Sequence, residues 1–335
     1  MTLKIGVVGT GLMGEDHVRR LATSISNAQV VAVSDVNVEQ AKRVADEVGP
    51  VRVSSEAHDL IGDDQVQAVV IASPGFTHEE YTLACIAAGK PVLCEKPLAP
   101  ETDACLRVVE AEAALPKRLV QVGFMRRYDD GFRAIKDALD SGQIGQPLLL
   151  HCKHRNPSVP AGFTSDMMIT DSVVHEIDVT RWLLGQEIVA ANILTPRRSS
   201  QAPEGLQDPQ FVLLETEHGV LVDVESFVTC QYGYDIRCEL VGETGTVSLA
   251  EQAAVDVREQ GRRYGAIPAD FRVRFADAYH NELQAWVNDV LRGEISGPSA
   301  WDGYATTAVA EHCLEALASG RRAVVELAER PPLYA

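Results

Sequence analysis

A glycine-rich turn near the amino terminus constrains the fold of this chain more than any other stretch. Residues 3–8 form the apolar run LKIGVV, and GTGLMG follows at 9–14, directly before a helical pattern that runs to about residue 25. Strand, GxGxxG and helix in this order are typical of a dinucleotide-binding unit, whereas a lone GxGxxG is also found in ordinary turns. We therefore predict a phosphate site at the start of this helix, formed by Gly9, Gly11, Leu12, Met13 and Gly14.

An acid follows the second predicted strand, where such units bind the adenosine ribose. The strand spans residues 29–34, and Asp35 lies about 20 residues past the last glycine. Its carboxylate can accept hydrogen bonds from both ribose hydroxyls but would repel a 2'-phosphate, and neither Val36 nor Asn37 is an arginine that could compensate. The sequence therefore favours NAD over NADP, with Asp35 and Val36 at the ribose.

Helices and strands then alternate to about residue 123. The helical patterns lie at 37–48, 55–62, 78–88 and 101–115, and the strand patterns at 51–53, 68–72, 91–94 and 119–124. Such alternation predicts an α/β fold with a doubly wound parallel sheet, whose ligands lie beyond the carboxyl ends of the strands. We therefore predict an NAD-binding Rossmann domain over residues 1–123.

Two strand ends of this domain carry polar residues. Ser73 and Pro74 follow one strand, and His78 begins the next helix, where it could equally be structural. Glu95-Lys96-Pro97 follows the next strand, and the proline forces Lys96 into an extended conformation that gives its ammonium a fixed direction. We predict cofactor contacts from five residues: Ser73, Pro74, His78, Glu95 and Lys96.

A second group of titratable residues lies in ITDSVVHEIDVTRW at 169–182. At helical spacing, Asp171, His175 and Asp178 share one face. Asp171 could then hydrogen-bond one ring nitrogen of His175 and leave the other for a substrate, as an acid–base pair requires. In the alternative, Thr170 or Asp171 caps the helix and His175 is an ordinary histidine. The dinucleotide site and the lysine elsewhere in the chain favour the catalytic interpretation.

The pattern changes in the second half. After a helix at 130–141, strand-like runs follow at 148–153, 189–195, 210–216, 220–227, 234–241 and 246–249, with HRNP at 154–157 as a loop and helices at 278–292 and 302–319. Consecutive strands without helices between them predict a mainly antiparallel sheet. We therefore predict an α+β domain with a large open sheet over residues 124–335, which binds substrate and forms oligomers.

Charge and cysteine content limit the partners and the compartment. Lys and Arg number 30 against 48 Asp and Glu, and the net charge of −18 disfavours nucleic acid and anionic membranes. No apolar run approaches the roughly 18 residues of a spanning helix. Seven cysteines without a CxxC pair, and a first strand that leaves no room for a signal peptide, predict a cytoplasmic protein. Without HExxH or a Cys/His ligand spacing, no metal is predicted.

Several motifs together resemble the glucose-fructose oxidoreductase and inositol dehydrogenase superfamily over nearly the whole chain. They are GTGLMG, the acid at 35, EKP at 95–97, VGFMRRYD at 122–129, HRNP at 154–157, DxxxHEID at 171–178, CQYGYDIRCELVGE at 230–243 and SGPSAWDGY at 296–304. EKP marks the superfamily as a whole. FMRRYD, HRNP and the tyrosine pair indicate its inositol branch.

This resemblance implies an NAD-dependent dehydrogenase that oxidises a secondary hydroxyl of a cyclic polyol, most closely myo-inositol at C2, and that forms a homotetramer. His175 would be the general base, Asp171 its orienting acid, and Lys96 the group that stabilises alkoxide charge. The other hydroxyls would be bound by Arg126, His154, Asn156, Asp178 and Tyr234. The sequence leaves open scyllo- or chiro-inositol, a pyranose such as glucose, and a protein that senses NAD and a sugar without turnover.

Overall fold

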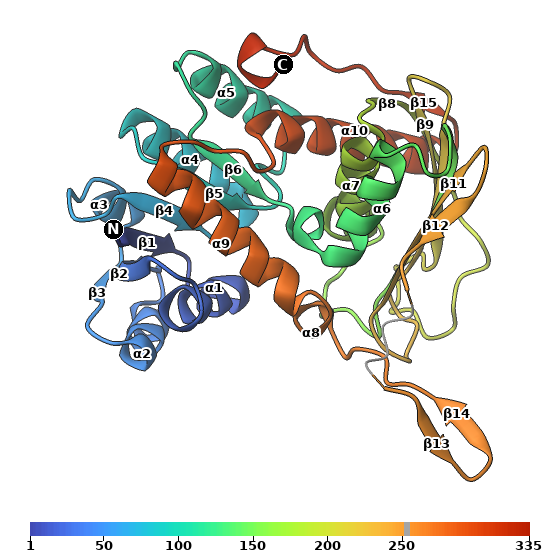
Figure 1. Cartoon of the computed structure of the whole chain (residues 1–335), viewed down its shortest axis with the longest axis horizontal. Coiled ribbons are helices and arrows are strands. Elements are labelled where there is room, and N and C mark those ends of the chain that lie inside the picture. Colours follow the sequence, from blue (N-terminus) through green and yellow to red (C-terminus); the bar gives the residue numbers. More distant parts are fainter. Residues whose placement is uncertain (251–254) are drawn as a thin grey trace. The chain divides into compact units, whose positions relative to one another are not determined.

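The computed structural model describes residues 1–250 and 255–335, which form two compact units (Figure 1). The first unit contains Met1–Phe124, Tyr279–Thr307 and Leu327–Ala335. The second contains the described part of Met125–Ala278 together with Ala308–Glu326. The chain thus returns to the first unit after most of the second has been completed.

The first unit is built on a parallel sheet of six strands in the order β3-β2-β1-β4-β5-β6. Its strands are β1 (Leu3–Val8), β2 (Ala28–Ser34), β3 (Arg52–Ser54), β4 (Ala68–Ile71), β5 (Val92–Glu95) and β6 (Val120–Gly123). The strand order reverses between β1 and β4, which is the topological switch point where doubly wound sheets bind their ligands. The predicted Rossmann fold is therefore confirmed.

Helices cover both faces of this sheet, as the nearly continuous apolar run of β1 requires. Ile5 and Val7 are fully buried in a core shared with α1 (Leu12–Thr23), α2 (Val38–Val48) and Trp286 of α9 (Ala276–Arg292). Gly6 faces the other way, where Leu60 of α3 (Ala57–Ile61) occupies the space beside it. The connections after β4 and β5 are α4 (His78–Ala87) and α5 (Thr102–Ala113).

The second unit is built on a sheet of seven strands in the order β12-β11-β7-β10-β9-β8-β15. They are β7 (Pro147–Arg155), β8 (Ile188–Leu194), β9 (Gln210–Thr216), β10 (Leu221–Phe227), β11 (Asp235–Gly242), β12 (Thr246–Ser248) and β15 (Ala323–Val324). Every pairing is antiparallel except that of β7 with β10. The mainly antiparallel sheet is therefore confirmed, with one parallel exception at its centre.

One face of this sheet is covered and the other is open to solvent within the unit. Along β7, the covered positions Leu150, Cys152 and His154 are buried, whereas Leu149 and His151 on the opposite face are partly exposed. The covered face packs against a helical layer. This layer consists of α6 (Asp130–Asp140), a π-helical turn at Met168–Val173 and α7 (Val174–Leu184).

Some elements differ from the sequence predictions. His154 and Arg155 lie in β7 and not in a loop, because both pair with β10 and β11. The helix expected from residue 169 begins as the π-helical turn, so Asp171 precedes the α-helix that carries His175. A small hairpin of β13 (Val257–Glu259) and β14 (Arg262–Tyr264) was not predicted, because its charged, exposed residues give no apolar alternation. In the described residues, no helix is long and apolar enough to span a membrane.

Candidate active site

The glycine-rich turn has the geometry that a dinucleotide site needs. Gly9 has a φ of +88°, and a Cβ at Gly9 or at Gly14 would collide with neighbouring backbone of the same unit. A Cβ at Gly11, by contrast, would meet no atom within 4 Å. Gly9 and Gly14 are therefore required by the fold, while Gly11 leaves open space at the start of α1 that a pyrophosphate fits. Leu12 and Met13 form the first turn of this helix.

Asp35 lies directly after β2 with its carboxylate held in a fixed orientation. Its Oδ2 accepts hydrogen bonds from the backbone nitrogen of Thr10 at 2.7 Å and from the Thr10 hydroxyl at 2.9 Å. Its Oδ1 accepts from the backbone nitrogen of Asn37 at 2.8 Å. A carboxylate has about four acceptor positions, so capacity for a ribose hydroxyl remains.

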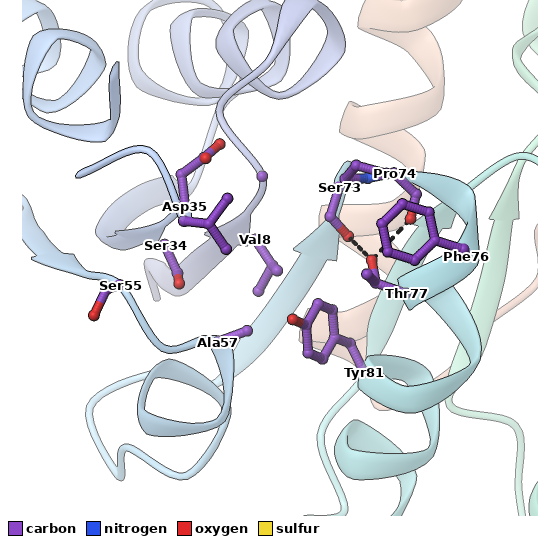
Figure 2. A pocket seen from close by; sticks show the side chains of 12 residues that line it. Val8, Ser34, Asp35, Ser55, Ala57, Ser73, Pro74, Phe76, Thr77 and Tyr81 are labelled. Carbon is purple, nitrogen blue, oxygen red and sulfur yellow. Dashed lines mark hydrogen bonds between the residues drawn. The ribbon is translucent and has the colours of Figure 1, made fainter. Parts of the chain in front are cut away.

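A pocket of about 150 Å³ lies beside this carboxylate. Figure 2 shows Asp35 on one side and side chains of the β4–α4 connection on the other. We call it the Asp35 pocket, and its lining is Val8, Gly9, Ser34, Asp35, Val36, Ser55, Ala57, Ser73, Pro74, Phe76, Thr77 and Tyr81. The sequence predicted Gly9, Asp35, Val36, Ser73 and Pro74 as cofactor-binding, and the structure brings these five together.

Several residues of the pocket were not predicted from the sequence. Phe76 is 77% exposed and offers an apolar surface at the pocket. Thr77 donates a hydrogen bond to the Pro74 carbonyl at 2.8 Å. Ser55 and Tyr81 come from the β3–α3 connection and from α4, so that only the fold brings them to the pocket. An exposed aromatic directly after a strand-end Ser-Pro-Gly was the one available clue.

The residues predicted around Lys96 lie outside this lining. Glu95 is the last residue of β5, and its carboxylate is hydrogen-bonded to the buried ring of His17. Lys96 is half-buried, and the peptide bond between it and Pro97 is cis. His78 is buried against two backbone carbonyls. Glu95 and His78 therefore bind protein groups on either side of Lys96.

In the second unit, two predicted substrate residues, Arg126 and His154, share a buried acid that was not predicted from the sequence. Glu176, on α7, forms an ion pair with Arg126 and accepts a hydrogen bond from Nδ1 of His154 at 3.0 Å. Nδ1 also lies 3.2 Å from Nη2 of Arg126. The guanidinium can only donate, so Nδ1 either accepts from Arg126 or donates to Glu176, but not both. Since the carboxylate is the nearer partner, Nδ1 carries hydrogen, and a neutral His154 presents an acceptor at Nε2.

The charges of this group are mutually compensated. Burial alone would raise the pKa of Glu176, but the charge of Arg126 and the hydrogen bond from His154 outweigh it and lower the pKa to about 2. Burial likewise opposes the charge of Arg126, and Glu176 raises the pKa of Arg126 above its usual range. The pair is thus ionised with both side chains only 2% exposed.

His175 and Tyr234 complete what we call the polar cluster, formed by Arg126, His154, His175, Glu176 and Tyr234. The His175 ring centroid lies 6.4 Å from that of His154, and the Tyr234 ring meets His154 edge-on at 5.9 Å. Burial, as the main cause, raises the pKa of Tyr234 to about 12. The two histidines can exchange protons with a hydroxylated ligand. The phenol of Tyr234 keeps its proton and can form hydrogen bonds with such a ligand.

The remaining predicted residues lie around this cluster in different settings. Asp178 is buried on α7 and binds Arg127 through two hydrogen bonds of 2.5 and 3.0 Å. Asn156 follows β7 directly and is half-buried, and Asp171 is exposed on the π-helical turn. Adjacent arginines of FMRRYD thus pair with the two acids of HEID. An acid inside a wholly buried helix needs such a partner, and this requirement was the signal that could have revealed Glu176.

Comparison with known proteins agrees with both halves of this geometry. A family model described as "Oxidoreductase family, NAD-binding Rossmann fold" matches residues 3–124, and "Oxidoreductase family, C-terminal alpha/beta domain" matches residues 136–327. Proteins named inositol 2-dehydrogenase from Pseudomonas fluorescens and inositol 2-dehydrogenase 1 from Saccharopolyspora erythraea are 52% and 55% identical over 335 residues. These alignments cover 100% of this chain and 100% and 99% of the relatives.

Solved structures give the same result. Myo-inositol dehydrogenase of Lactobacillus casei, in complex with NAD(H) and myo-inositol, matches with a TM-score of 0.98 at 36% identity, covering 100% of both chains. Scyllo-inositol dehydrogenase of the same species, with NAD(H) and scyllo-inositol, matches with a TM-score of 0.89 at 28% identity, covering 97% of this chain and 99% of the other. With its glycine-rich turn, ribose-side acid and two-part architecture, the chain belongs to the GFO/IDH/MocA family of NAD-binding oxidoreductases.

Proposed function

We infer that this protein is an NAD-dependent dehydrogenase that oxidises a secondary hydroxyl of an inositol, with myo-inositol as the proposed substrate and its 2-keto derivative as the product. The full-length likeness to a dehydrogenase solved with NAD(H) and myo-inositol carries this inference. The open backbone at Gly11 and the oriented carboxylate of Asp35 fit the dinucleotide. When bound, NAD supplies the acceptor for the hydride that leaves the substrate carbon.

Three side chains are assigned to the chemistry. His175 takes the hydroxyl proton as general base, and Asp171 orients its ring and stabilises the imidazolium that forms. Lys96 donates a hydrogen bond to the reacting oxygen and stabilises the negative charge that grows on it. The burial of His175, which is 8% exposed, supports this assignment, because excluding water strengthens each of these interactions.

The other hydroxyls of the ring are assigned to a set of polar side chains. His154 accepts at Nε2, because Glu176 holds its other nitrogen. The salt bridges of Arg126 and Asp178 limit the hydrogen-bonding capacity that each has left for a substrate. The full proposed set is Arg126, His154, Asn156, Asp178 and Tyr234.

A panel of cyclic polyols and aldoses tests this function. With NAD present, we expect NADH to form fastest with myo-inositol. The formation of NADH is measured by its absorbance at 340 nm. Faster turnover of scyllo- or chiro-inositol, or of glucose, would reassign the substrate. Binding of NAD without turnover of any member would favour a sensor of the same fold.

We also propose a homotetramer that works in the cytoplasm. The open face of the second sheet exposes apolar side chains, including Leu149 and Leu221, which lie side by side on paired strands. A face of this kind is typical of a subunit interface. All seven cysteines are buried free thiols, as in proteins of a reducing compartment. Light scattering of the purified protein is expected to give four chains, and a mass of one chain would contradict the assembly.

A further inference from the structure

Both neighbours of Lys96 in the chain are tied to buried histidines of the first unit. Glu95 precedes the lysine and Pro97 follows it. His17 contacts the first and His78 contacts the second, and neither histidine lines the Asp35 pocket. These contacts lie outside the proposed chemistry, so their role has to be sought in what they hold.

On the Glu95 side, a carboxylate is fixed by a ring from α1. His17 is fully buried, and its Nε2 lies 2.6 Å from Oε1 of Glu95, to which it donates. Oε2 of Glu95 accepts from the backbone nitrogen of Lys96 at 3.2 Å. A Cβ at Gly123 would lie 3.0 Å from this same oxygen, so β6 leaves just enough room for the carboxylate. The carboxylate therefore links α1, the helix behind the glycine-rich turn, to the main chain of Lys96.

On the Pro97 side, a ring from α4 spans two strand ends. Nδ1 of His78 lies 2.7 Å from the carbonyl oxygen of Pro97, and Nε2 lies 2.8 Å from the carbonyl oxygen of Ser73. The ring thus joins the segment after β5 to the segment after β4. Ser73 lines the Asp35 pocket, so His78 connects the Lys96 segment to the wall of that pocket.

The two carbonyls determine the charge of this ring. A carbonyl oxygen can only accept, so each ring nitrogen must donate, and a histidine with two N–H groups is an imidazolium. A neutral tautomer would place a nitrogen lone pair against an oxygen lone pair inside the protein, where such repulsion is costly. Burial opposes the charge, but the Cys94 sulfur on β5 and the two carbonyls outweigh it and raise the pKa of His78 to about 9.

We propose that His17 and His78 are positioning residues that fix Lys96 from both sides, and that His78 does so as an imidazolium at neutral pH. His17 sets the main-chain nitrogen of Lys96 through Glu95, and His78 sets the carbonyl that follows. The helices that carry these histidines, α1 and α4, both begin beside the proposed cofactor site. The consequence for rate rests on the proposed role of Lys96, whereas the charge of His78 does not.

Neutron diffraction from a deuterated crystal at pH 7.5 tests the charge without any substrate. We expect deuterium on both Nδ1 and Nε2 of His78, and on Nε2 of His17. A single deuteron on His78 would overturn the imidazolium. This result stands whether or not the protein oxidises a polyol.

Structures and kinetics of His78→Gln and His17→Gln test the positioning. We expect the main chain at Lys96 to move in each variant, and kcat to fall roughly 10- to 100-fold while KM changes little, as for misplaced catalytic groups. His218→Gln, at an exposed hairpin turn, is the matched control and should keep full activity.

The decisive step is a double-mutant cycle with Lys96→Ala. If the histidines act through the lysine, either substitution should lower the residual rate of Lys96→Ala by less than about twofold, because the interaction is already lost. Additive losses, or an unmoved Lys96 in the variant structures, would overturn the proposal. If no polyol is oxidised at all, the proposed function fails. The position of Lys96 in the variant structures then still decides whether the two histidines position this lysine.

Discussion

The Asp35 pocket of the first unit and the polar cluster of the second unit treat their acids in opposite ways. Asp35 is half-buried, and its partners, the Thr10 hydroxyl and two backbone nitrogens, carry no charge. Glu176 is fully buried, its charge is matched by that of Arg126, and it accepts a hydrogen bond from His154. A charge left uncompensated at a pocket can select a ligand, whereas a compensated charge inside a fold holds other groups in place. The two sites should therefore fail differently when their acids are changed.

The largest effect is expected at the proposed base within the polar cluster. His175→Ala should lower kcat by on the order of 10²- to 10⁴-fold, because a positioned acid–base group contributes about that much. Asp171→Asn should also damage turnover by favouring the wrong tautomer of His175. Steady-state kinetics together with NAD titration check this expectation. Near wild-type kcat in His175→Ala, with NAD still bound, would move the role of base to Lys96.

The next effect is on stability and sharpens the contrast between the two acids. Glu176→Gln should lower the free energy of unfolding by about 3–5 kcal/mol, because it leaves the charge of Arg126 buried without its partner. Asp140→Asn removes the acid of an exposed pair with Lys136 in the same unit and should cost about 0.5 kcal/mol or less. Chemical denaturation of both variants measures the difference. Equal losses would remove the distinction between compensated and exposed charge.

Acid titration gives a second measurement of the same pair. The pKa of Glu176 is about 2 when folded and near 4.5 when unfolded, so the unfolded chain binds the proton first as pH falls. The stability that the ionised carboxylate provides is therefore complete above about pH 4.5 and is lost toward pH 2. The melting temperature of Glu176→Gln should fall less between pH 5 and 3 than that of the wild type. Parallel curves would show that folding does not lower the pKa of Glu176.

The smallest effect is expected at Asp35 and concerns the preference for NAD over NADP. The wild-type protein should prefer NAD to NADP by at least roughly tenfold in kcat/KM, or about 1.4 kcal/mol. Asp35→Asn should narrow this ratio and should cost about 1 kcal/mol of stability, because the amide oxygen can still accept from Thr10 while the hydrogen bond from the Asn37 nitrogen is lost. Asp46→Asn on the exposed surface of α2 changes the net charge equally and should leave the ratio unaltered. Equal use of both cofactors by the wild type would contradict the role of Asp35.

The same contrast explains what the sequence could and could not predict. Gly9, Gly14 and Asp35 were predicted with their settings, because the strand, turn and helix that place them are contiguous in the chain. Glu176 was not, because its partners lie 50 and 22 residues away and are set by tertiary packing. The π-helical turn before His175 gave no signal, since apolar spacing does not separate it from an α-helix. The role of His78 depends on two carbonyls that no side-chain pattern encodes.

The position of β7 at the centre of the second sheet has a consequence for synthesis. Its partners on β10 and β11 lie 72 and 80 residues further along the chain, at the pairs His151–Asp223 and Arg155–Asp235. A ribosome adds about 5–20 residues per second, so β7 waits roughly 4–16 s with both edges unpaired. During that time its apolar stretch is open to pairing with other nascent chains. The strand that carries His154 is thus paired only after most of the second sheet has been synthesised.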